Sequence, residues 1–233
     1  MLRQNRGVAA IRGVLFDWGD TLFSPPDAGQ VIVTVARERG VRIEPVEARA
    51  LWDELWEAGK TPEELAKGRD LSADAHREVW TALFERAHGR VPGIARDLYE
   101  RVMDPRAWIP YPDTAPTLRA LRERDAKIGI VSNVPRDLRP IFAAAGLAEL
   151  VDAFTHSFEV GAEKPDPAIF RKACERLGTR PQETLMVGDH AVADGGAVKA
   201  GLRFHLLPPD AAPDRPRGLG RVVAIVDASR EAR

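Results

Sequence analysis

The sequence contains only one cysteine, Cys174, among 233 residues. This excludes an internal disulfide and any metal site built from several cysteines, and we expect Cys174 to be a small core residue. Neither charge is in excess, with 34 Lys plus Arg against 35 Asp plus Glu. The chain therefore lacks the basic field that attracts nucleic acid or an anionic membrane. No apolar run approaches the roughly 20 residues of a membrane span. We expect neither nucleic acid nor membrane as a partner.

The first ten residues contain Arg3 and Arg6 but no apolar core long enough for a secretory signal peptide. We therefore expect a cytoplasmic protein. A length of 233 residues accommodates one large domain, or a core with a smaller second domain. The composition, 44% hydrophobic and 30% charged, is typical of a globular chain. The sequence carries no signal for a particular oligomeric state.

Apolar runs bounded by turn residues alternate with helical patterns in the second half of the chain. A first strand is expected to end at Phe16, and further strands at Lys127–Val131, Phe154–His156, Thr184–Val187, Leu202–Leu207 and Val222–Val226. Helices are expected at Asp113–Glu123, Arg136–Ala145 and Pro167–Leu177, and a small-residue helix ends at Gly201. This alternation predicts an α/β fold, a Rossmann-like, doubly wound parallel sheet covered on both faces.

Between the first strand and Trp108 we expect helices and no strand. The predicted helices run from Asp27 to about Arg39, over Pro45–Ala58, from Thr61, over Ser72–Ala87 and over Pro92–Met103. Four tryptophans are expected to form the core of this block, and two histidines to lie on its surface: Trp52, Trp56, Trp80 and Trp108, and His76 and His88. The sequence thus predicts an α/β core domain of residues 1–24 and 109–233, and an inserted all-helical domain of residues 25–108.

Polar residues follow the predicted strands at the points where the strands end. Asp17 follows the first strand, Ser132 and Asn133 a second, and Asp189 a later one, while Lys164 lies on a loop. The carboxyl ends of parallel strands border the ligand crevice of such a sheet. A carboxylate can attack phosphorus, while lysine and a hard cation such as Mg²⁺ neutralise the phosphate. The pattern indicates chemistry on a phosphoryl group.

These residues resemble the motifs of the haloacid dehalogenase-like hydrolase superfamily, and the resemblance covers nearly the whole chain. The first motif, Asp-x-Asp-x-Thr, is similar to Asp17-Trp18-Gly19-Asp20-Thr21. The second, a strand ending in Ser or Thr, is similar to the run ending at Ser132. The third and fourth resemble Lys164-Pro165, and Gly188-Asp189 with Asp194 at the usual offset. The helical block is similar to the family's cap domain. Four motifs in this order make the resemblance specific.

The resemblance implies a role for each matched residue. Asp17 is the nucleophile and a metal ligand, and the backbone carbonyl of Gly19 is a second ligand. Ser132 and Lys164 hold the transferring phosphoryl group. Apart from the resemblance, the side-chain amide of Asn133 at the same strand end can donate to the equatorial oxygens of a phosphoryl group, so we expect Asn133 to bind substrate as well.

The remaining matched residues belong to the metal site and the nucleophile loop. Asp189 is a ligand of Mg²⁺, directly or through water, and Asp194 supports Lys164 and the metal shell. Thr21 forms a hydrogen bond within the nucleophile loop. The implied function is that of a Mg²⁺-dependent phosphomonoesterase, which hydrolyses a small phosphorylated metabolite through an aspartyl-phosphate intermediate.

One position departs from the pattern of the family's phosphatases. They usually carry a second aspartate two positions after the nucleophile, which protonates the leaving group and then activates water; here that position is Gly19. Asp20 is acidic but one position later, and we expect it to have a structural or capping role in the turn rather than that of a substitute acid. Loss of a general acid costs typically about 10²–10⁴ in rate, so we still expect activity.

Two alternatives remain open from the sequence. One is a carbon-site hydrolase of the same family, either a haloacid dehalogenase or a phosphonatase. Dehalogenases of this type usually lack the Gly-Asp of the fourth motif, which is present here, and a phosphonatase needs a Schiff-base lysine from the cap, where the helical block offers Lys60 and Lys67. The other alternative is a binding or regulatory protein on a catalytically weakened scaffold, supported by Gly19 alone.

Overall fold

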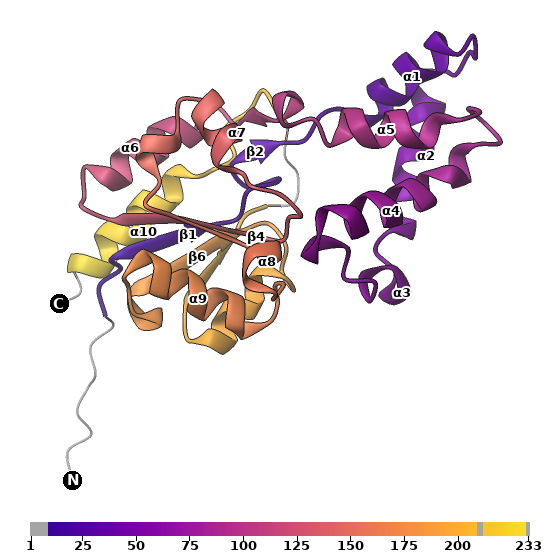
Figure 1. Cartoon of the computed structure of the whole chain (residues 1–233). Helices are drawn as coiled ribbons and strands as arrows, with labels where there is room; N and C mark the ends of the chain where they lie inside the picture. The colour runs from indigo at the N-terminus through magenta and orange to yellow at the C-terminus, as the bar shows by residue number, and fades with distance from the viewer. Residues whose placement is uncertain (1–8, 209–211, 232–233) are drawn as a thin grey trace. The chain divides into compact units, whose positions relative to one another are not determined.

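The structure is a computed structural model, and it describes residues 9–208 and 212–231. The chain divides into two compact units (Figure 1). The core unit comprises the described residues up to Ser24, Pro110–Asn133, and the described residues from Asp137 onwards. The helical unit comprises Pro25–Ile109 and Val134–Arg136. In the described part of the chain, no helix has the length and apolarity needed to cross a membrane.

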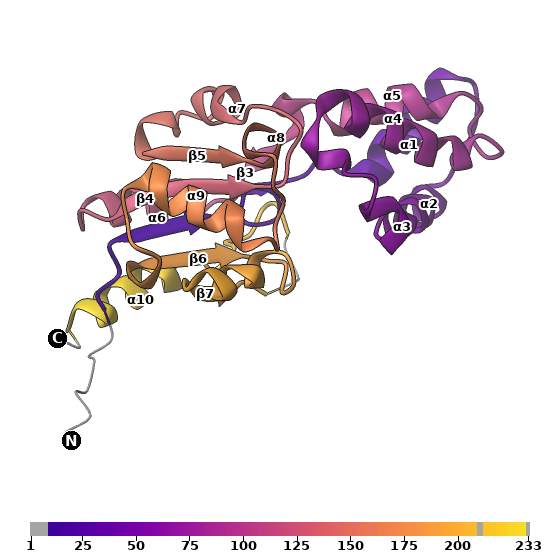
Figure 2. The ribbon, with the colours of Figure 1, turned by 60° about the horizontal axis from the view of Figure 1, so that its bottom comes forward.

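The core unit is built on a parallel sheet of five strands in the order β5-β4-β1-β6-β7 (Figure 2). The strands are β1 Gly13–Phe16, β4 Lys127–Ser132, β5 Ala153–His156, β6 Thr184–Gly188 and β7 Arg203–Leu206. Phe16 of the central strand pairs with Ile130 on one side and Val187 on the other. Because the chain runs outward from β1 to β5 and then crosses back to β6, the strand order reverses beside β1. Ligand sites of open α/β sheets lie at this kind of position.

Helices cover both faces of this sheet, which confirms the predicted α/β fold. The covering helices are α6 Thr114–Arg122, α7 Arg139–Ala144, α8 Ser157–Val160, α9 Pro167–Leu177 and α10 Gly220–Glu231, with short 3-10 helices at Ala148–Leu150, Pro181–Glu183 and Asp194–Ala200. Figures 1 and 2 show α9 on one face of the sheet, with α6 and α10 on the other. Cys174 is buried on α9, as expected. The small-residue helix before Gly201 is present as the 3-10 helix Asp194–Ala200.

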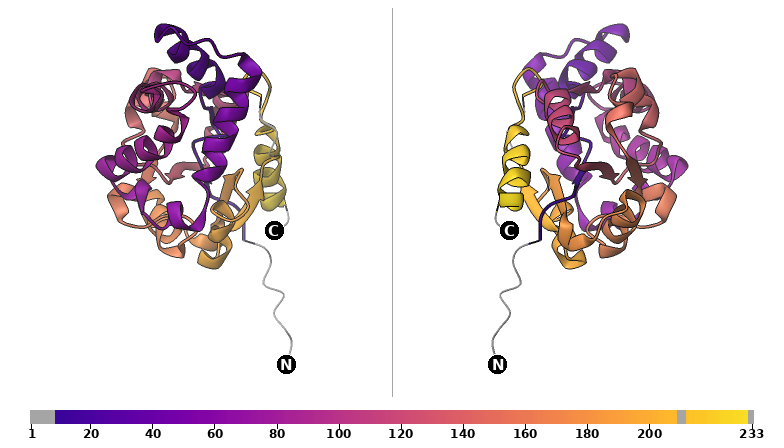
Figure 3. Two further views of the ribbon diagram at one scale, coloured as in Figure 1. Left: turned by 90° about the vertical axis from the view of Figure 1, so that its right-hand side faces the viewer. Right: turned by 90° about the vertical axis from the view of Figure 1, so that its left-hand side faces the viewer.

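Two predictions in the core unit were wrong. Val222–Val226 is not a strand but part of α10, which lies along the core unit in Figure 3. Val222, Val226 and Ser229 are its buried residues, a spacing of three to four that belongs to a helix face. The helix expected from Arg136 begins instead at Arg139, because the chain before it turns so that the Leu138 amide donates to His156 Nε2.

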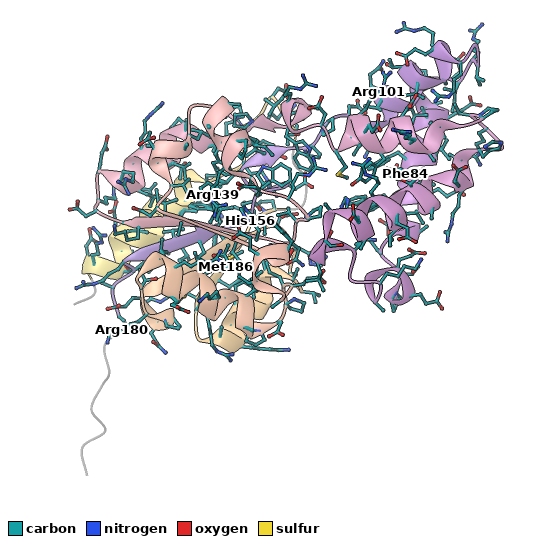
Figure 4. All side chains as sticks on the ribbon, in the orientation of Figure 1. Phe84, Arg101, Arg139, His156, Arg180 and Met186 are labelled. Atoms are coloured by element: carbon teal, nitrogen blue, oxygen red, sulfur yellow. The ribbon has the colours of Figure 1, made fainter. Side chains whose placement is uncertain are left out.

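The helical unit has a hydrophobic core of its own. Its elements are α1 Ala28–Glu38, α2 Pro45–Ala58, α3 Pro62–Leu65, α4 Ala73–Phe84 and α5 Ile94–Val102, with 3-10 helices at Arg69–Leu71, Glu85–Ala87 and Pro105–Ala107. Side-chain oxygens of Asp27, Thr61 and Ser72 cap α1, α3 and α4. Phe84 here and Met186 of β6, both fully buried, mark the two separate cores in Figure 4.

Three details of the insertion differ from expectation. Two short strands, β2 Phe23–Ser24 and β3 Ile109–Pro110, pair where the helical insertion begins and ends in the sequence. Trp80 lies in the core as predicted, but Trp56 stacks on it at 5.5 Å between ring centroids and remains 38% exposed. His76 was predicted on the surface and is buried, whereas His88 is exposed.

His76 is held in the core of the helical unit as a neutral imidazole. Its Nδ1 lies 3.0 Å from the hydroxyl of Tyr99. Asp70 is 3.6 Å from Nε2, but burial, Arg136 and Arg69 lower the pKa of His76 from 6.5 to about 3. Between these two pH values the unfolded chain binds a proton at His76 that the folded chain does not.

We expect the free energy of unfolding to fall as the pH drops below 6.5, because protonation of His76 favours the unfolded chain. One pH unit below that value, the loss from this residue should be about 1.4 kcal/mol. Urea-induced unfolding of the wild type and of His76→Gln, which cannot take up the proton, measures it at each pH. An equally steep decline in the variant would contradict the assignment.

Candidate active site

Asp17 lies directly beyond the end of β1, on a loop that is tightly bonded to itself. The Asp17 amide donates to the carbonyl of Val187 in β6 at 2.9 Å, which ties this position to the neighbouring strand. The carbonyl of Trp18 accepts from the amides of Leu22 and Phe23 at 2.9 and 3.0 Å. These bonds fix the backbone around Asp17.

Lys164 is the buried cation of the site. Its Nζ lies 2.8 Å from Asp17 Oδ1 and 2.6 Å from Asp194 Oδ1, and the residue is 6% exposed. Burial opposes the charge, but Asp17 and Asp194 outweigh it and raise the pKa of Lys164. The ammonium therefore stays charged and sits between two carboxylates.

Two side chains hold Lys164 in position. Asn133, predicted to bind substrate, clamps the Lys164 backbone: its Oδ1 accepts from the Lys164 amide at 2.7 Å and its Nδ2 donates to the Lys164 carbonyl at 3.0 Å. Asp194 is fully buried. Its Oδ1 accepts from Lys164 Nζ and its Oδ2 from the His190 amide at 2.9 Å. Ser132, the last residue of β4, is buried at the neighbouring strand end.

The acidic residues predicted as metal ligands gather at this edge. One carboxylate oxygen each from Asp17, Asp189 and Asp194 lies within 4.8 Å of the others. Thr21 is buried and donates through Oγ1 to Asp189 Oδ1 at 3.1 Å. Burial and the neighbouring Asp17 raise the pKa of Asp189. A compact set of oxygen donors with excess negative charge fits a hard divalent cation such as Mg²⁺.

Asp20 is part of the structure of the loop that follows β1 and carries Asp17. It adopts a left-handed backbone conformation with φ of 51°, and its amide donates to the carbonyl of Phe23 at 2.8 Å. Burial and Asp189 raise the pKa of the Asp20 carboxyl to about 6, while Arg217 acts in the opposite direction. Its backbone contacts agree with the structural role expected from the sequence.

The structure adds a residue that sequence reasoning missed. Arg217, just before α10, is buried, and its Nε donates to the carbonyl oxygen of Asp20 at 2.6 Å. The contact joins residues 197 positions apart, and no local pattern around Arg217 signals it.

A parallel sheet that presents carboxylates and a buried lysine beyond the ends of neighbouring strands places the protein among the α/β enzymes. The family model "haloacid dehalogenase-like hydrolase" matches residues 11–201, and the chain belongs to this family of hydrolases.

Several proteins similar to this chain are named phosphatases. The chain is 35% identical over 186 residues to a phosphoserine phosphatase of Thermus thermophilus, covering 75% of this chain and 73% of that protein. The crystal structure of a HAD phosphatase from Thermococcus onnurineus matches with a TM-score of 0.61 at 26% identity, covering 93% of this chain and 98% of that one. An L-2-haloacid dehalogenase from Xanthobacter autotrophicus matches with a TM-score of 0.67 at 22% identity, covering 93% and 98%, and shows the shared fold.

Gly188, at the end of β6, leaves the space that Asp194 occupies. A Cβ atom at this position would lie 2.1 Å from Asp194 Oδ2 and 2.8 Å from Asp194 Cβ. Gly188→Ala must therefore displace Asp194 from Lys164. We expect a loss of about 1–3 kcal/mol in the free energy of unfolding, as for other overpacked sites, together with loss of hydrolase activity.

Urea-induced unfolding and hydrolysis assays measure both effects. Gly195→Ala is the matched control, because its Cβ would meet only the Phe204 ring at an ordinary 3.6 Å. A Gly188→Ala protein as stable and as active as this control would show that the position of Asp194 does not matter.

Proposed function

We propose that the protein is a Mg²⁺-dependent phosphomonoesterase acting on a small phosphorylated metabolite, with Asp17 as the nucleophile. The observation that carries this proposal is the ion pair of 2.8 Å between Lys164 Nζ and Asp17 Oδ1 at the carboxyl edge of the sheet. The ion pair sets a buried cation beside a carboxylate. A phosphoryl group under attack would need both groups. The similarity to named phosphatases supports the same reaction.

In the proposed reaction a carboxylate oxygen of Asp17 attacks phosphorus. A P–O bond forms to Asp17, and the bond to the leaving oxygen breaks, with its electron pair departing on that oxygen. Water then hydrolyses the aspartyl phosphate, which releases phosphate and restores the carboxylate. Lys164 offsets the charge of the phosphoryl oxygens, and the Ser132 hydroxyl donates to one of them. We assign Asn133 to positioning Lys164 through its two backbone contacts.

The metal-binding residues of the proposal are Asp17, Asp189 and the backbone carbonyl of Gly19. When bound there, Mg²⁺ supplies positive charge that neutralises the phosphate. Thr21 orients Asp189 through its hydrogen bond of 3.1 Å. Asp194 already engages Lys164 and the His190 amide with its two oxygens. We therefore assign it to supporting the lysine and the shell around the metal.

We further propose that the helical unit corresponds to the family's cap domain. Its lysines disfavour the phosphonatase alternative. Lys60 Nζ lies 2.6 Å from Glu57 Oε1 and Lys67 Nζ 2.8 Å from Glu64 Oε2. Both side chains are nearly half exposed, whereas a Schiff-base lysine needs a desolvated amine.

Purified protein should hydrolyse members of a panel of phosphorylated metabolites in the presence of Mg²⁺ and lose that activity in EDTA. Asp17→Asn should reduce kcat by several orders of magnitude, because an amide cannot form the acyl phosphate. Asp214→Asn, an exposed aspartate in the core unit, is the matched control and should match the wild type. Full hydrolysis of a phosphorylated metabolite in EDTA would contradict the proposed Mg²⁺ dependence, and activity of Asp17→Asn above a few per cent would remove Asp17 as nucleophile.

The glycine at position 19 predicts a steep dependence on the leaving group. Without a carboxylic acid there, the departing oxygen carries negative charge, so aryl and acyl phosphates should react faster than alkyl phosphates. Across a series, log kcat/KM should fall with leaving-group pKa, with differences on the order of 10²–10⁴, the typical contribution of a general acid. Equal rates for aryl and alkyl phosphates, with chemistry limiting, would reveal another acid in the site.

A further inference from the structure

Arg217 reaches from the C-terminal part of the core unit to the nucleophile loop. The residue is 4% exposed, and its Nε donates to the Asp20 carbonyl at 2.6 Å. Its guanidinium carbon lies 5.9 Å from the centre of the Tyr111 ring. A hydrogen bond from a charged donor in a buried setting is stronger than one between neutral groups. The contact therefore constrains the backbone three residues after Asp17.

The segment that carries Arg217 is itself anchored. The carboxylate of Asp113 accepts from the amides of Arg217, Gly218 and Leu219, each at 2.8 Å. Gly218 has a φ of 88°, which favours glycine because other residues rarely adopt this backbone conformation. With its backbone fixed in this way, Arg217 loses less conformational freedom when it holds the loop.

The nucleophile loop needs such a restraint because it concentrates negative charge. Asp17 and Asp189 both act on Asp20 as like charges, and Asp20 also keeps a left-handed backbone that is unfavourable for most residues. Lys164 binds Asp17 and Asp194, and Arg217 lies close enough to Asp20 to counter this repulsion. The two buried cations thus act on different carboxylates of the site.

We infer that Arg217 is a positioning residue for the nucleophile loop: through the Asp20 carbonyl it holds the turn that carries Asp17 and Gly19 in the geometry needed for attack. It acts through the backbone and does not touch the reacting atoms. The effect on rate rests on the proposed phosphatase function, whereas the effect on the loop does not.

The test compares Arg217→Met with Arg215→Met, an exposed arginine two residues earlier that serves as the matched control. Hydrogen–deuterium exchange of the peptide containing the amides of Asp20, Leu22 and Phe23 reports the loop directly. We expect exchange there to become at least about tenfold faster in Arg217→Met, while the strands stay protected.

We also expect kcat to fall by about 10–100-fold with little change in KM, because misplacing a reacting group mainly lowers the rate of the bound complex. Arg215→Met should match the wild type in both.

Conservative variants separate positioning from a general loss of structure. Arg217→Lys keeps a charged donor and should recover part of both losses. Asp113→Asn should weaken the anchor of Arg217 and shift exchange and kcat in the same direction by a smaller amount. These two variants decide the matter if Arg217→Met does not fold.

Wild-type exchange and wild-type kcat in Arg217→Met would overturn the inference, as would faster loop exchange with an unchanged kcat. If the wild type hydrolyses no phosphate ester, the proposed function fails, and the exchange measurement alone still decides whether Arg217 holds the loop.

Discussion

The site depends on one buried ammonium group placed between two carboxylates. A charge as deeply buried as that of Lys164 is very costly unless it is paired, and Asp17 and Asp194 provide the pairing at 2.8 and 2.6 Å. The surrounding structure serves this arrangement. Asn133 clamps the lysine backbone, and Gly188 leaves room for Asp194. Loss of Asp17 or Asp194 would leave the lysine charge uncompensated, and Asn133 and Gly188 contribute by keeping the paired groups in position.

The order of the strands explains how distant segments supply these groups. Because β1 is flanked by β4 and β6 in a parallel sheet, the segments after all three strands emerge at the same edge. They bring Asp17, Asn133 and Asp189 together from three parts of the chain. Lys164 reaches this edge from the loop before α9, where a Cβ on Gly196 would collide with the Pro165 carbonyl oxygen at 2.5 Å. The parallel sheet sets the general position of each group, and close packing of the connecting segments sets the final distances.

Much of this arrangement could be predicted from the sequence, and the failures share a physical cause. Apolar runs ending in polar residues located β1, β4 and β6 and the residues beyond them. A short valine-rich run fits a strand and a helix equally well, and only the burial of Val222, Val226 and Ser229 at helical spacing distinguishes the helix over Val222–Val226. The burial of His76 and the contact from Arg217 to Asp20 depend on residues distant in sequence. No local pattern records such contacts, because they arise only when separate elements pack.

The departure at Gly19 acquires its meaning from the same loop. If Asp20 were free to swing toward a leaving group, it would be a candidate to replace the missing acid. Its backbone, however, is bonded at both ends, with the amide donating to the carbonyl of Phe23 and the carbonyl accepting from Arg217. In the proposed reaction the loop thus presents the Asp17 carboxylate for attack, with no second carboxylate at position 19. In the proposed reaction, formation of the bond to phosphorus is assisted by the protein, whereas departure of the leaving group depends on the chemistry of the substrate.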